Sequence, residues 1–110
     1  MELTEAHLRL LQTLLAGGFT PVSFPLFPNF VGIQKYGCAA LLRLVGQGRL
    51  ELAAQAGYLL EGNISVVVER GGEKWFVWKS LEVRATPERL GRLRRFEEEL
   101  TELLERPAVV

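Results

Sequence analysis

Cys38 and His7 are the residues of this chain best suited to form a nucleophile with its general base. A cysteine attacks as the thiolate, so it needs a neighbouring base or cation to lose its proton near neutral pH. The spacing of the two residues does not indicate that they meet, and a lone cysteine is most often a small buried apolar residue. His7 also falls in the first turn of a predicted helix, where the helix dipole disfavours an imidazolium. We therefore predict no catalytic residue, and the sequence favours a binding protein over an enzyme.

Lys35, Tyr36 and Cys38 form a second group of polar side chains, directly after a segment rich in proline and phenylalanine. Lysine and tyrosine can bind an anion or take part in proton transfer. A pocket lined by these three residues would make the chain a small-molecule binder or an enzyme. The alternative is that they lie at the edge of a strand, with the tyrosine half-buried and the lysine solvated.

The composition excludes several classes of site. All 13 acidic residues are glutamate, so the chain has no aspartate for an EF-hand loop or an aspartyl nucleophile. One cysteine and one histidine cannot build a zinc finger, and neither a GxGxxG motif nor a P-loop motif is present. We therefore expect no metal and no cofactor.

Charge and hydropathy limit the partners and the location of the protein. The formal net charge of zero disfavours nucleic acid and anionic membranes as partners. The sequence has no run of about 18 apolar residues, so we expect no membrane span. A single cysteine cannot form an internal disulfide, which favours a cytoplasmic protein. The preference for arginine over lysine and for glutamate over aspartate is typical of a GC-rich or thermophilic source, and we expect a bacterial one.

The chain fits a single domain, residues 1–110, with a helix near each end. Thr4 can cap a helix over residues 4–16, which a pair of glycines would end. A threonine followed by proline then begins a second helix over residues 87–105, with its apolar residues in one stripe.

Residues 64–83 give the strongest strand signal. Two apolar runs are joined by a pair of glycines, which is a favoured hairpin turn. The resulting antiparallel register places Val68 opposite Trp75 on an apolar face, and we expect that face to form the core. Phe76 and Trp78 then lie on the other face of the hairpin, which we expect a second layer of the fold or a subunit contact to cover.

Residues 30–60 allow two interpretations. The alternation of apolar and polar residues over 49–56 favours strands. With the hairpin, this predicts an α+β fold: an N-terminal helix, an antiparallel meander of four to five strands, and a C-terminal helix packed on one sheet face. Good helix formers over 38–45 and 49–56 would instead give two short helices, and so a winged-helix protein that binds nucleic acid. The secondary structure of residues 38–56 distinguishes the two.

Three features make up the predicted interaction surface. Segment 19–30 carries four phenylalanines among three prolines, and it packs either on its own core or on a partner. The outer face of the hairpin and the last helix are the other two features. The residues of this surface are Phe24, Phe27, Phe30, Phe76, Trp78, Arg92, Arg95, Glu99 and Glu102.

The order of charges in the last helix indicates a homodimer. An arginine-rich first half and a glutamate-rich second half oppose the helix dipole. Two copies packed antiparallel would set each arginine half against the partner's glutamate half, and a two-fold axis produces that arrangement. A solvated helix face is the alternative. We therefore expect a non-enzymatic protein-interaction module that binds a second copy or another protein, with the winged helix and the small-molecule pocket as alternatives.

Overall fold

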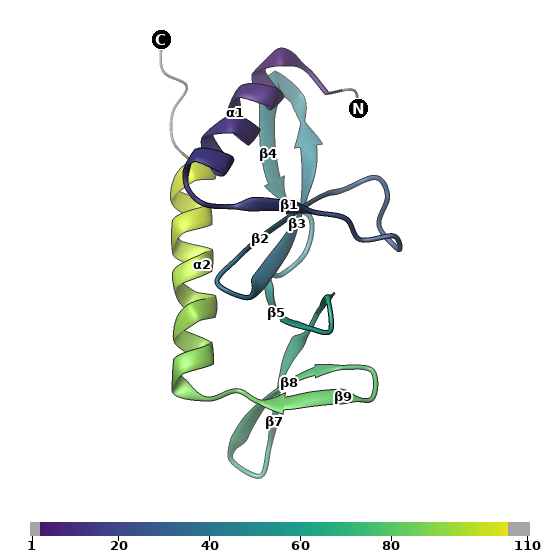
Figure 1. Cartoon of the computed structure of the whole chain (residues 1–110), viewed down its shortest axis with the longest axis vertical. Coiled ribbons are helices and arrows are strands. Elements are labelled where there is room, and N and C mark those ends of the chain that lie inside the picture. The colour runs from purple at the N-terminus through teal and green to yellow at the C-terminus, as the bar shows by residue number, and fades with distance from the viewer. Residues whose placement is uncertain (1–2, 106–110) are drawn as a thin grey trace.

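The structure, a computed structural model, describes residues 3–105 and places two helices, which contact each other, beside an antiparallel β region (Figure 1). Helix α1 spans Glu5–Ala16 and helix α2 spans Pro87–Glu105. The strands are β1 (Thr20–Val22), β2 (Val31–Lys35), β3 (Cys38–Val45), β4 (Arg49–Leu52), β5 (Gly57–Leu60), β6 (Asn63–Ile64), β7 (Val66–Arg70), β8 (Glu73–Trp78) and β9 (Leu81–Arg84), with a 3-10 turn at Gly46–Gly48. The predicted α+β fold is confirmed.

The strands form two sheets within residues 3–105, rather than the single meander of four to five strands that the sequence predicted. The larger sheet has the order β1-β2-β3-β5-β6, and β4 also pairs with β3; the smaller sheet has the order β7-β8-β9. The strands are short and numerous because tight turns interrupt the chain. Glu61 and Gly62, for example, both have positive φ angles, of 48° and 80°, and reverse the chain between β5 and β6.

Residues 38–56 contain strands, which decides between the two sequence interpretations. Strand β3 pairs with β4 from Leu42 opposite Leu52 to Val45 opposite Arg49. The structure therefore lacks the two helices that a winged helix would need in this part of residues 3–105, and that architecture is wrong for this chain.

Both helices begin at the predicted caps. The Thr4 hydroxyl accepts a hydrogen bond from the His7 backbone at 3.3 Å, and His7 Nδ1 accepts one from the Thr4 backbone at 3.0 Å. The Thr86 hydroxyl accepts one from the Arg89 backbone at 3.3 Å. His7 Nε2 lies 2.7 Å from the carbonyl oxygen of Val45, so this buried imidazole also fastens α1 to the end of β3.

Helix α2 runs beside the β region and contacts α1, β3, β4 and β5 (Figure 1). The rings of Phe19 and Phe96 meet edge to face there, with 5.5 Å between their centroids. The largest fully buried apolar side chains are Phe19, Phe76, Phe96, Leu14, Leu42 and Leu100. They come from both helices and both sheets, so one core joins all layers.

The register predicted for the β7–β8 hairpin is confirmed, but the prediction of its core face is wrong. Val68 does lie opposite Trp75. Phe76, however, is fully buried and stacks on Tyr58 of β5, with 4.9 Å between ring centroids, whereas Val66 is 60% exposed. Both faces of this hairpin are apolar, so alternation cannot identify the inner one. The face that carries Phe76 is the one that packs on β5.

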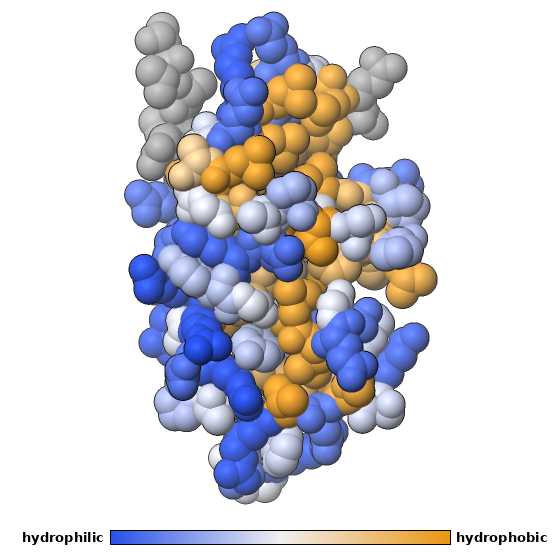
Figure 2. All heavy atoms as spheres, viewed as in Figure 1, coloured by the Kyte–Doolittle hydropathy of each residue, from blue (hydrophilic) through white to orange (hydrophobic). Residues whose placement is uncertain are grey.

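The segment rich in proline and phenylalanine is divided between the core and the surface. Phe19 is buried, whereas residues 23–30 form a loop that projects from the β region (Figure 1). Gly32 permits this path, because a Cβ atom there would lie 2.2 Å from the Val22 carbonyl oxygen and 2.7 Å from the Phe24 ring. Hydrophobic residues gather along the middle of the same view, the projecting loop carries both kinds, and hydrophilic residues cover the outer side of α2 (Figure 2).

Candidate functional site

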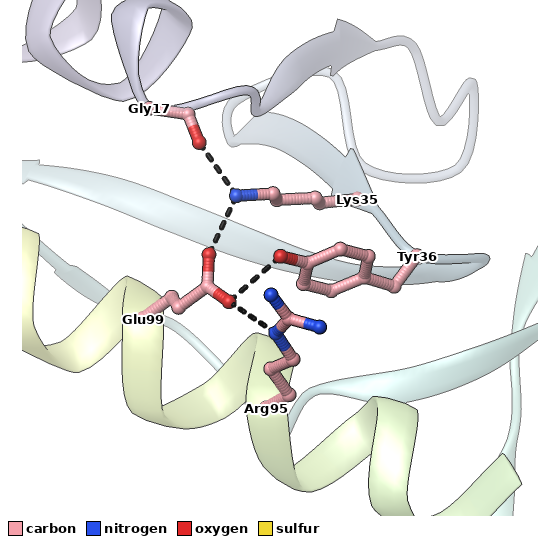
Figure 3. Close-up of polar contacts among 5 residues, drawn as sticks. All are labelled: Gly17, Lys35, Tyr36, Arg95 and Glu99. Carbon is pink, nitrogen blue, oxygen red and sulfur yellow. Dashed lines mark hydrogen bonds and ion pairs between the residues drawn. The ribbon is translucent and has the colours of Figure 1, made fainter. Parts of the chain in front are cut away.

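The side chains of Lys35 and Tyr36 are both bonded to Glu99 of α2, so they point at this helix and not into an open pocket (Figure 3). Lys35 Nζ lies 2.5 Å from Glu99 Oε1 and 2.6 Å from the Gly17 carbonyl oxygen. The Tyr36 hydroxyl donates to Glu99 Oε2 at 2.7 Å, and Arg95 Nε donates to the same oxygen at 2.9 Å. We call these five residues the polar clamp. It joins the end of α1, the β2–β3 turn and the middle of α2.

The electrostatics of the polar clamp are those of a satisfied ion pair. The hydrogen bonds from Lys35 and then Tyr36, with a smaller contribution from Arg95, lower the pKa of the Glu99 carboxyl to about 2. The hydrogen bond to Glu99 raises the pKa of Lys35. Both side chains are therefore charged near neutral pH. Tyr36 has a φ of 57° and Gly37 one of 76°, as a two-residue hairpin turn between β2 and β3 requires, and this turn presents the Tyr36 hydroxyl to Glu99.

Cys38 and His7 do not form a catalytic pair. Cys38 is fully buried, and burial raises the pKa of its thiol to about 11, so it carries almost no thiolate near neutral pH. Both ring nitrogens of His7 are occupied, by Thr4 and by the Val45 carbonyl. Of the three residues predicted for a ligand pocket, Lys35 and Tyr36 are bonded to Glu99 and Cys38 is buried in the core.

An apolar groove of about 270 Å³ lies between the projecting loop, the β5–β6 hairpin and the start of β7. Its lining includes the nearly buried Leu41 and the small side chains of Ala54 and Ala56. The full lining is Phe24, Pro25, Leu26, Phe27, Leu41, Ala54, Gln55, Ala56, Gly62, Asn63, Ile64, Ser65, Val66, Val67 and Trp78. Among these described residues none is charged, so the groove offers an apolar surface without an electrostatic preference.

The groove brings together three of the residues predicted for interaction. Phe24, Phe27 and Trp78 all line it. Phe30 does not line it but lies beside Phe27, with 6.3 Å between ring centroids. Phe76 was predicted at the surface and is buried, which corrects that part of the prediction.

The charged residues predicted on α2 are paired within the chain. Arg92 lies 2.6 Å from Glu88, one turn earlier, and Arg95 lies 2.9 Å from Glu99, one turn later. Glu102 is exposed on the same helix. These internal pairs weaken the motive for an antiparallel packing of α2 against a second copy, because these two arginines already have partners.

Sequence reasoning missed most of the groove and the bond between Lys35 and Glu99. Leu26 and Val66 stand on segments far apart in sequence, and the alternation of the hairpin gave no sign that its first residues border a hollow. Lys35 and Glu99 are 64 positions apart, and no local pattern links them.

Two other kinds of feature are absent from the described part of the chain. Residues 3–105 contain no cluster of three histidine, cysteine, aspartate or glutamate side chains that could hold a metal ion. No helix within the same residues is long and apolar enough to cross a membrane.

Comparison with protein-family models, with curated proteins and with solved structures found no match to this chain.

Proposed function

We propose that this chain is a non-enzymatic protein-interaction module that forms a homodimer through its apolar groove, and that it acts in the cytoplasm. The observation that carries the proposal is the groove itself: an uncharged hollow bordered by Leu26, Val66 and Val67, which are 68%, 60% and 42% exposed. Contiguous exposed apolar surface of this kind marks protein contacts. The cytoplasm suits a protein whose only cysteine is free and buried.

The polar residues support a binding role rather than catalysis. Within residues 3–105, every buried side-chain nitrogen and oxygen already has a hydrogen-bond partner. The Cys38 thiol is protonated, and the Lys35 ammonium is neutralised by Glu99. These buried polar groups stabilise the fold through their internal bonds instead of facing a substrate.

Sedimentation equilibrium of the wild type beside Val67→Lys tests the proposal. The wild type should sediment as a dimer, and the lysine should weaken its dissociation constant on the order of 100-fold, because the interface would bury an unpaired ammonium. Leu15→Lys is the matched control, since Leu15 is a similarly exposed apolar residue on α1 that lies outside the groove lining. This control should stay dimeric. A wild type that remains monomeric at the highest soluble concentration would refute the proposal.

A further inference from the structure

We infer that the groove of each copy holds the projecting loop of a second copy, so that two copies clasp each other reciprocally. This inference rests on the proposed function and specifies how its dimer is built. The occupant is thus residues 23–30 of the partner subunit, with the leucine at its tip as the anchor.

The projecting loop is preformed for this role. The Phe27 backbone N–H donates to the Phe24 carbonyl at 2.8 Å, and the Phe30 N–H donates to the Phe27 carbonyl at 3.2 Å. Phe24 is seated over Gly32, and Phe27 lies beside Phe30. The loop therefore presents Leu26 without first becoming ordered, and this lowers the entropy that association costs. At 68% exposure, Leu26 is the most exposed large apolar side chain of residues 3–105.

The loop and the groove are complementary to each other by position. Residues Phe24 to Phe27 form one wall of the groove, and the start of β7 with Trp78 lies on its lining too. A ridge that runs beside a hollow fits a second copy of itself: a two-fold axis between them places each ridge in the other hollow. The same patch thus supplies both halves of an isologous contact.

Charge favours a second copy over a charged partner. A two-fold axis brings each group near the axis close to its own equivalent, so a charged patch would repel itself. Residues 23–30 contain no charged side chain, and the described lining residues contain none. Nucleic acid or a charged peptide would find no complementary charge in the groove, whereas the neutral loop meets no repulsion there.

The polar groups of the groove fit an apolar occupant. The Ser65 hydroxyl donates to the Tyr58 carbonyl at 2.6 Å. The Asn63 amide donates to the carbonyls of Leu60 and Glu61 at 3.4 and 3.2 Å. Because these polar atoms are already bonded within the chain, they are not free to bind a polar small molecule. The apolar walls are then the main binding surface.

Mixing two variants in trans tests the clasp. Leu26→Glu places a carboxylate at the tip of the loop, which also borders its own groove, whereas Val67→Lys places an ammonium in the groove and leaves the loop unchanged. Each variant alone should dissociate on the order of 100-fold more readily than the wild type. Their mixture should restore a heterodimer, because the introduced carboxylate of one chain then faces the introduced ammonium of its partner. Native mass spectrometry of chains with unequal isotope labels detects that heterodimer.

A matched mixture of Leu26→Lys with Val67→Lys controls for simple exchange of subunits, and it should recover less heterodimer because the two lysines repel. Circular dichroism melting shows whether each variant keeps its fold. If Val67→Lys weakens the dimer and Leu26→Glu does not, the clasp is wrong but the proposed function stands. A wild type that is monomeric throughout would overturn both.

Discussion

The polar clamp and the apolar groove differ in what their side chains do. Those of the clamp are bonded to one another and stabilise the fold, whereas those of the groove are exposed to a binding partner. The clamp collects the groups that suggested chemistry in the sequence, Lys35 and Tyr36, and occupies them with Glu99. The groove consists of unreactive side chains, yet several of them are exposed without a covering layer. A reactive residue type therefore indicates little about function until the partners of its side chain are known. Exposed apolar surface, by contrast, indicates a contact directly.

The largest expected effect distinguishes buried aromatic residues from those at the groove. Phe76→Ala should lower the free energy of unfolding by about 4 kcal/mol, because Phe76 is fully buried against Tyr58 and its loss leaves a cavity. Phe27→Ala should lower it by about 0.5 kcal/mol or less, because Phe27 is 40% exposed. Urea unfolding of both variants measures the difference. Equal losses would show that the two aromatic residues are not divided between core and surface.

A smaller effect is expected from breaking the clamp. Glu99→Ala should lower the free energy of unfolding by about 2 kcal/mol, because it leaves the Lys35 ammonium, which is only 16% exposed, without its carboxylate. Glu98→Ala is the control, since Glu98 is the exposed neighbour one position earlier, and its change should fall within about 0.5 kcal/mol. Chemical denaturation of both variants measures these values. If the two variants lose equal stability, the clamp contributes nothing specific.

Acid should remove the contribution of the clamp without any mutation. The pKa of Glu99 is lowered from 4.5 to about 2 in the folded chain, so its stabilising effect is complete above pH 4.5 and is lost as the pH falls toward 2. The difference in unfolding free energy between the wild type and Glu99→Ala should therefore shrink steadily between about pH 5 and pH 2. Urea titrations across this range measure it. A difference that stays constant with pH would show that the carboxylate charge is not what stabilises the clamp.

The parts of the fold predicted from sequence are those set by neighbours along the chain. The caps at Thr4 and Thr86 and the register of the β7–β8 hairpin depend on residues within a few positions of each other. Local hydrogen bonds and cross-strand charges act in any tertiary setting, so sequence alone reveals them.

The candidate site depends on contacts between distant segments, and sequence reasoning recovered only part of it. Phe24, Phe27 and Trp78 were identified because aromatic residues near prolines or on a strand face are conspicuous. The face that buries Phe76 could not be chosen, since both faces of the hairpin carry apolar side chains of similar size. The clamp was missed because Glu99 and Lys35 meet only when α2 packs on the β2–β3 turn. That packing is a property of the whole core.

The most direct measurement is sedimentation equilibrium of Val67→Lys and Glu99→Ala at the same concentration, at neutral pH and in the absence of denaturant. If the groove binds and the clamp only stabilises, Val67→Lys should be a folded monomer, and its melting temperature should fall only by what the lost association contributed. Glu99→Ala should melt earlier and remain dimeric. The reverse result, a dimer for Val67→Lys and a folded monomer for Glu99→Ala, would contradict the division between the two regions.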